Sequence, residues 1–135
     1  MKKITISIFG FVFFSLYSVA QTNIKASIDR GKIVYETYCL TCHQDDGGGV
    51  PKLNPPLIKT SYVSGDKKKL IKWVLQGTTE KIAIDGKFYS NNMAPQNYLK
   101  DEEIADVLTY IRNNFNNKGT AVTPAEVKAV RATVK

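Results

Sequence analysis

Sulfur and imidazole side chains are scarce in this chain of 135 residues. Beyond residue 20 it has one histidine, His43, one methionine, Met93, and two cysteines, Cys39 and Cys42. A structural zinc site needs about four Cys or His ligands, an iron–sulfur cluster about four thiolates, and a secreted disulfide scaffold several bridges. The sequence therefore excludes these three kinds of structure.

Apolar residues are also few once the N-terminal segment is set aside. They make up 43% of the chain, but 13 of them fall among the first 20 residues. The rest of the chain carries 17 basic and 12 acidic side chains, an excess that bears on solubility and partners and not on fold. A chain of this length forms one domain, and its own apolar residues make a thin core.

Residues 1–20 have the pattern of a secretory signal peptide. Two lysines precede an apolar run over residues 4–17, and small residues stand where signal peptidase would cut, between Ala20 and Gln21. An uncleaved membrane anchor is the alternative, because about 17 apolar residues can just cross a bilayer. We therefore expect a periplasmic protein, attached to a membrane only if the N-terminal segment is retained.

The rest of the chain divides into three parts. We expect residues 21–26 to form a short leader, residues 27–117 a folded domain, and residues 118–135 a C-terminal extension. Thr123 and Glu126 have the spacing of a capping box, which predicts a short basic helix within the extension.

Apolar periodicity predicts a mostly helical domain. Helical spacing is found at residues 28–38, at residues 66–77 and, most clearly, from Asp101 onward. Three lysines occupy the first turn of the second of these helices, where their positive charges interact unfavourably with the helix dipole. Alternation around an Asp-Gly turn predicts a small hairpin or an extended loop over residues 81–89, and the Gly- and Pro-rich residues 44–64 indicate a structured loop.

The run Cys39-Leu40-Thr41-Cys42-His43 carries the chemistry of the chain. C-x-x-C-H predicts covalent attachment of c-type haem. Two thiols three residues apart at a helix end can reach the two vinyl groups on one porphyrin edge, and the imidazole of the following histidine can then ligate the iron. A thioredoxin-like thiol pair is the alternative, but that motif belongs in a βαβ setting and needs no histidine here. The expected export supports the haem interpretation, because haem is attached outside the cytoplasm.

A six-coordinate haem iron needs a second axial ligand. Met93 is the remaining soft donor, and it lies 50 residues after His43, in a loop beside Pro95. A methionine that fills a core gap would be expected on an apolar stripe instead. We therefore expect Met93 to ligate the iron, with lysine or tyrosine ligation or an open position as the alternatives.

These residues, together with others along the chain, resemble a class I, monohaem cytochrome c of the bacterial kind. The further elements of the resemblance are Gly31-x-x-x-Tyr35, Gly49-Val50-Pro51, Pro55-Pro56-Leu57, Val74-Leu75-x-Gly77, Asp85-Gly86-x-x-Tyr89, Met93-Ala94-Pro95 and Asp106-Val107-Leu108-Thr109-Tyr110-Ile111-Arg112. The resemblance implies an all-α cytochrome c fold, with three to five helices around a covalently bound haem and the hairpin before the Met93 loop. It also implies that the N-terminal helix crosses the last helix of the domain at Gly31.

The same resemblance implies roles for three more residues. The Pro55 carbonyl would accept a hydrogen bond from the Nδ1–H of His43, which fixes the ring and its basicity. Trp73 and Tyr89 are candidates to donate to a buried haem propionate, and either is equally explained as a packing aromatic. The chain departs from the family at two places. Lys100 stands where a Ser or Thr helix cap is usual, and Asn91 and Asn92 precede Met93 where a glycine is common.

With both axial positions filled by protein, no site remains for oxygen or substrate. We therefore expect a one-electron carrier that holds one haem c and is not an enzyme. Three alternatives are a dedicated cytochrome subunit of a periplasmic oxidoreductase, a haem-based gas sensor with a labile Met93, and a haem-free thiol oxidoreductase that uses Cys39 and Cys42.

The expected partners are redox proteins that donate and accept electrons, and no nucleic acid is expected among them. A partner with an acidic face is one interpretation of seven lysines that fall in segments placed by the resemblance around the haem crevice, and scattered solvated charge is the alternative. They are Lys52, Lys59, Lys67, Lys68, Lys69, Lys87 and Lys100.

Overall fold

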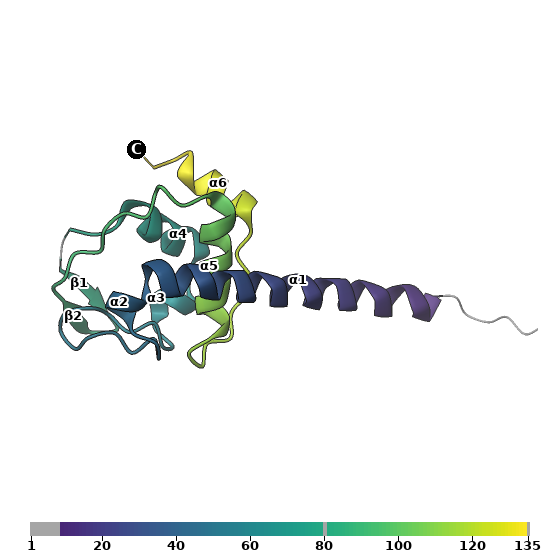
Figure 1. Cartoon of the computed structure of the whole chain (residues 1–135), viewed down its shortest axis with the longest axis horizontal. Helices are drawn as coiled ribbons and strands as arrows, with labels where there is room; N and C mark the ends of the chain where they lie inside the picture. Colours follow the sequence, from purple (N-terminus) through teal and green to yellow (C-terminus); the bar gives the residue numbers. More distant parts are fainter. Residues whose placement is uncertain (1–8, 80, 135) are drawn as a thin grey trace, which may run out of the picture.

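The computed structural model describes residues 9–79 and 81–134, which form six α-helices and one small antiparallel sheet (Figure 1). In chain order the elements are α1 (Phe9–Tyr38), α2 (Leu40–His43), α3 (Ser61–Ser64), α4 (Lys67–Gln76), β1 (Ile82–Ile84), β2 (Lys87–Tyr89), α5 (Asp101–Asn113) and α6 (Pro124–Arg131). This mostly helical fold with one hairpin agrees with the predicted fold class.

The first helix is longer than predicted. We expected it to begin at Ile28, whereas α1 begins at Phe9 and continues unbroken to Tyr38, with its N-terminal half projecting from the body of the molecule (Figure 1). The predicted start is wrong because residues 11–30 contain no glycine or proline that would end a helix. The two lysines of the predicted signal peptide lie outside the described residues. Within residues 9–79 and 81–134, no helix combines the length and the hydropathy needed to span a membrane.

The backbones of α1 and α5 meet at Gly31. A Cβ atom at Gly31 would overlap with the carbonyl of Asp106 and would lie 2.8 Å from the Cβ of Tyr110. One turn further along α1, the ring of Tyr35 is 1% exposed and its centroid lies 5.4 Å from that of Tyr110. Arg30 donates two hydrogen bonds to the Asp106 carboxylate, from Nε at 2.6 Å and from Nη2 at 2.8 Å. The helix crossing expected at Gly31 is thus confirmed.

The C-terminal helix α6 packs against α4 and α5. Val127 and Val130 are buried in the same apolar core as those helices. The predicted capping box is confirmed, because the Thr123 N–H donates to the Glu126 carboxylate at 2.7 Å and the Glu126 N–H donates to the Thr123 hydroxyl at 3.2 Å. The Nζ of Lys67, in the first turn of α4, lies 2.6 Å from the same carboxylate.

The hairpin is also confirmed, since β1 pairs antiparallel with β2 and Asp85 and Gly86 form the turn between them. The loop expected over residues 44–64 contains one helical element, the single turn α3. Its first residue follows Thr60, whose hydroxyl accepts from the Val63 N–H at 3.3 Å. One turn is too short to show an apolar period, which is why the sequence did not predict it.

We expect Gly31→Ala to lower the free energy of unfolding by at least about 2 kcal/mol, because the added methyl group forces α1 and α5 apart. The gain of about 1 kcal/mol in helix propensity is too small to offset this. Urea unfolding followed by circular dichroism measures the change. Lys32→Ala, at an exposed neighbouring position of α1, is the control and should stay near wild type. A Gly31→Ala protein as stable as the control would contradict the close approach of the two helices.

Candidate functional site

The C-x-x-C-H run begins directly after the last residue of α1. The Cys39 N–H donates to the Tyr35 carbonyl at 2.9 Å, and the His43 N–H donates to the Cys39 carbonyl at 3.0 Å, so the run continues from the helix as a further turn, α2. Cys39 is half-buried and Cys42 is exposed. The Tyr35 hydroxyl donates to the Gln44 carbonyl at 2.6 Å. Tyr35, which packs at the α1–α5 crossing, therefore holds both ends of the run.

The imidazole of His43 is fixed by one hydrogen bond. Its Nδ1 lies 3.0 Å from the carbonyl oxygen of Pro55, which can only accept, so Nδ1 carries the proton and Nε2 is left with a free lone pair. Burial lowers the pKa of His43, and the hydrogen bond to Pro55 acts in the opposite direction. A neutral imidazole with Nδ1 engaged in this way is ready to ligate a metal through Nε2. The contact expected between His43 and Pro55 is present.

Gly49 allows the loop after His43 to fold back onto Pro55. Its φ of 65° lies in the left-handed region that favours glycine, and a Cβ there would lie 2.5 Å from the Asn54 oxygen and 2.6 Å from the Pro55 oxygen. The Gly49 N–H donates to the His43 carbonyl at 3.0 Å. The loop is thus closed on itself with the Pro55 carbonyl beside the imidazole.

Met93 is held through its backbone to Thr78, the second residue after the end of α4. The Thr78 N–H donates to the Met93 carbonyl at 2.8 Å, and the Met93 N–H donates to the Thr78 carbonyl at 3.0 Å. Gly77, with a φ of 65°, makes this approach possible, because a Cβ there would overlap with the Met93 carbonyl and lie 2.7 Å from the Pro95 nitrogen. The side chain of Met93 is half-buried.

Hydrogen bonds also join the Met93 segment to the loop that contains Pro55. The Ser90 N–H donates to the Lys52 carbonyl at 3.0 Å, and the Asn91 N–H donates to the Leu53 carbonyl at 3.1 Å. The Asn91 side-chain amide donates to Asn54 Oδ1 at 3.1 Å. The structure therefore connects the loop that holds His43 with the segment that carries Met93.

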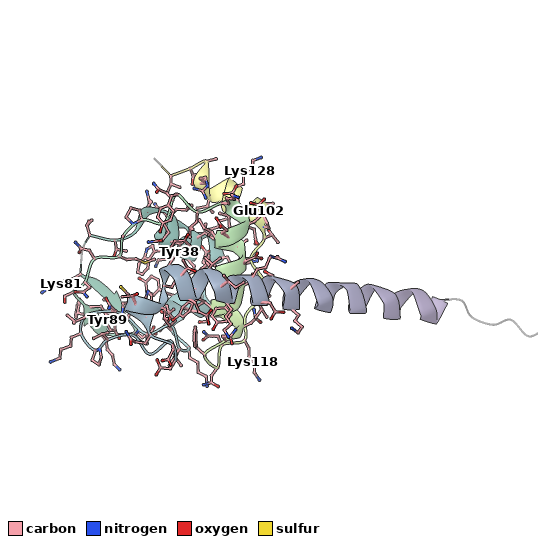
Figure 2. All side chains as sticks on the ribbon, viewed as in Figure 1. Tyr38, Lys81, Tyr89, Glu102, Lys118 and Lys128 are labelled. Atoms are coloured by element: carbon pink, nitrogen blue, oxygen red, sulfur yellow. The ribbon has the colours of Figure 1, made fainter. Side chains whose placement is uncertain are left out.

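The two aromatic candidates lie in different surroundings. Trp73, on α4, stacks on Tyr62 with ring centroids 4.3 Å apart, which supports its role as a packing residue. Tyr89, on β2, is 8% exposed and lines a cavity of about 730 Å³ together with the loop that follows His43. Figure 2 shows Tyr89 and Lys81 at the hairpin end of the molecule, opposite the projecting part of α1. Whether either aromatic donates to a propionate stays a prediction.

The residues of this region fit a covalently bound haem. They offer one imidazole with a free Nε2, one thioether, and two thiols that are not joined to each other, a nitrogen and sulfur donor set suited to iron. Leu57 and Val74 pack at the edge of the apolar core while remaining only half-buried, so an apolar disc would cover them. Burial raises the pKa of Cys39 to about 12, whereas a thiol oxidoreductase needs a lowered one.

Known proteins share these features. The cytochrome c family model matches residues 28–115. The chain is 35% identical over 116 residues to a cytochrome c-552 of Thermus thermophilus, and the match covers 79% of this chain and 77% of that protein. It is 30% identical over 114 residues to the cytochrome c subunit of a quinone alcohol dehydrogenase of Gluconobacter oxydans, and 32% identical over 129 residues to the fructose dehydrogenase cytochrome subunit of Gluconobacter japonicus. The last two matches cover 78% and 87% of this chain, and 22% and 26% of those proteins.

A chain with this fold and these donors is a haem-binding electron-transfer protein and not an enzyme. It belongs to the cytochrome c family and carries one covalently attached haem c. The predicted family, fold class and cofactor are confirmed.

Sequence reasoning missed Thr78. Its contacts with Met93 use backbone atoms, so its side chain gave no signal, and a glycine directly after a helix was the one available clue to a close approach there.

We expect Gly77→Ala to displace the Met93 segment and to cost more stability than Gly86→Ala. Both residues have positive φ, so each alanine introduces backbone strain of about 1–2 kcal/mol, but nothing lies within 4 Å of a Cβ at Gly86. The overlap with the Met93 carbonyl should add about 1–3 kcal/mol to the Gly77 variant. Urea unfolding gives the difference, and the NMR shift of the Met93 methyl group reports the displacement. Equal losses with an unmoved methyl signal would contradict the geometry.

Proposed function

We propose that this cytochrome c is a one-electron carrier whose haem is attached at Cys39 and Cys42 and ligated by His43 and Met93. The hydrogen bond between His43 Nδ1 and Pro55 is the observation that carries the proposal, because it leaves the lone pair of Nε2 available to ligate the iron. When bound, haem supplies an iron that takes up and releases one electron. The contribution of the chain is to hold the two ligand segments in place in both oxidation states.

The backbone contacts of Met93 favour a carrier over a gas sensor. Two hydrogen bonds to Thr78 and the tight packing against Gly77 restrain the segment that a labile ligand would have to move. A thioether opposite an imidazole also favours the reduced iron and raises the potential relative to two nitrogen ligands. Added carbon monoxide should therefore leave the spectrum of the reduced protein almost unchanged, whereas a sensor would bind it.

We infer that the protein is exported, with cleavage between Ala20 and Gln21. The N-terminal pattern supports this, and so does the need of a cytochrome c for haem attachment outside the cytoplasm. N-terminal sequencing of periplasmic protein tests it. Protein found in the membrane fraction and starting at residue 1 or 2 would favour the anchored form.

The cavity beside the hairpin supports a basic docking face. Three lysines line it, Lys52, Lys81 and Lys87, next to Phe88, which is 66% exposed. Charge surrounding an exposed aromatic suits a brief contact with an acidic redox protein. Lys67, in contrast, is paired with Glu126 away from this cavity.

A role as a subunit of a dehydrogenase is the second candidate. It is favoured by the similarity of this chain to part of two dehydrogenase cytochrome subunits. Purification under mild conditions separates the two functions, because a subunit would elute together with an enzyme and a free carrier would elute alone.

We expect the purified holoprotein to keep its haem through acid–acetone extraction. Its intact mass should exceed that of the polypeptide by one haem, and no free thiol should be titratable, because Cys39 and Cys42 are both consumed as thioethers. Cys42→Ala should retain haem through a single bond, and the double variant should lose it to the solvent. Haem extracted from the unaltered protein would contradict attachment at these residues.

Met93→Ala should abolish the far-red sulfur-to-iron band of the oxidised protein and lower the reduction potential, because the thioether that favours the reduced iron is removed. Absorption spectroscopy and redox titration measure the two effects. Asn92→Ala, at the exposed neighbouring position, is the control and should keep both values. An unchanged band in the Met93 variant would assign the ligand to another residue.

Reduction of an acidic partner should slow as ionic strength rises. The Debye length falls from about 30 Å at 0.01 M to about 10 Å at 0.1 M, which screens the lysines from the partner. Stopped-flow rates over this range test the effect, and Lys87→Gln should flatten the dependence more than Lys128→Gln on α6. A rate that stays constant would indicate a largely apolar contact instead.

A further inference from the structure

The last residue of α6, Arg131, binds the segment that leads from Met93 to α5. Its Nη1 donates to the Asn97 carbonyl, its Nη2 to the Leu99 carbonyl, and its Nε to Asp101 Oδ1, each at 2.7 Å. The guanidinium is a planar group with fixed donor directions. Three hydrogen bonds to one segment therefore fix the position of that segment, in addition to neutralising the charge of Asp101. Arg131 is the one guanidinium that reaches this segment within the described residues.

The bound segment lies directly downstream of the proposed ligand. Three residues separate Met93 from Asn97. Among them, Pro95 restricts the backbone, and the Gln96 N–H donates to the Val74 carbonyl at 2.8 Å. Thr78 holds Met93 itself. The loop is therefore held at Thr78, at the end of α4 and, through Arg131, at the beginning of α5.

The helix that carries Arg131 is a firm support. Val127 is 0% and Val130 7% exposed, and the Glu126 carboxylate caps the N-terminus of α6 while it also binds Lys67 of α4. Figure 1 shows α6 lying against α5 at the end of the chain. An arginine on such a helix restrains its partners more than the same group on a free terminus would.

Arg131 also borders the space between α4 and the Met93 loop. A cavity of about 490 Å³ is lined by Leu75 and Gln76 from the end of α4, by Pro95 and Asn97 from the loop, and by Arg131. The side chain of Arg131 is 31% exposed and that of Asp101 24%. The contact is thus partly shielded from water, which strengthens it relative to a surface ion pair.

We propose that Arg131 is a positioning residue for the axial ligand, so that the C-terminal extension keeps Met93 on the iron. The inference rests on the proposed ligation by Met93. Without the three hydrogen bonds, residues 97–101 are free to shift, and the loop opens more often. An outside ligand can occupy the iron only while the loop is open, so its apparent affinity measures the open fraction.

Imidazole binding to the oxidised full-length holoprotein tests this inference. Arg131→Gln should raise the apparent imidazole affinity about tenfold or more, since a hydrogen bond to a charged group changes an equilibrium by at least that factor. Arg131→Lys, which keeps the charge but not the planar group, should give a smaller increase. It also serves as the test variant if Arg131→Gln does not fold.

Two controls separate positioning from general destabilisation. Arg30→Gln removes a similar two-bond contact with Asp106 at the α1–α5 crossing, and Lys128→Gln removes one positive charge from α6. Lys128→Gln should bind imidazole as the unaltered protein does. Arg30→Gln weakens the crossing without touching the Met93 segment, so any rise in its imidazole affinity should be smaller than that of Arg131→Gln. An Arg131 variant that binds imidazole no better than wild type, or no better than Arg30→Gln, would overturn the inference.

The proposed ligation is tested separately by the unaltered protein. If it lacks the far-red sulfur-to-iron band, Met93 is not the ligand and the proposed function fails at that point. If the band is present and the Arg131 variants behave as the controls do, only the positioning role is wrong.

Discussion

The crossing of α1 and α5 at Gly31 is the contact on which the site depends. α1 leads directly into Cys39, and α5 begins where the loop from Met93 ends, so the packing of the two helices helps to set the distance between the segments that carry the two proposed ligands. Backbone contact at Gly31 makes the distance between the two helices as short as their packing allows. The rings of Tyr35, Tyr110 and Phe115 lie within 6 Å of one another and fill the remaining space, and the Tyr35 hydroxyl then reaches the Gln44 carbonyl just past the motif.

Around this crossing, the site is assembled mainly by backbone contacts. Gly49 and Gly77 have the same φ of 65°, and each allows a carbonyl-bearing segment to approach where a side chain would collide. The first approach brings Pro55 to the imidazole and the second brings Met93 to Thr78. Close backbone contacts of this kind tolerate little displacement. This rigidity suits electron transfer, because a similar geometry in both oxidation states keeps the reorganisation energy low.

The sequence predicted those features that depend on local pattern. The periodicity of α4 and α5, the Asp85-Gly86 turn and the capping box at Thr123 that begins α6 all involve residues close together in the chain, and the structure has each of them. The start of α1 was misplaced because residues 11–30 contain no glycine or proline to end the helix, although the mostly polar residues 21–27 lack an apolar period. The contacts of Arg131 were not predictable, since two of its three acceptors are backbone carbonyls, which every residue offers.

The lysines in the first turn of α4 show how the extension is tied to the domain. A positive charge at a helix N-terminus is unfavourable, but the Nζ of Lys67 lies 2.6 Å from the Glu126 carboxylate and donates to the Ala121 carbonyl at 2.9 Å. Partial burial alone would raise the pKa of Glu126, yet the hydrogen bonds from Lys67 and Thr123 outweigh it and lower that pKa, so the carboxylate stays charged at neutral pH. The charge of Lys67, which is unfavourable at the N-terminus of α4, thus attaches α6 to α4 through Glu126. Because α6 in turn places Arg131 against the segment after Met93, residues 118–134 belong to the physical unit that forms the site.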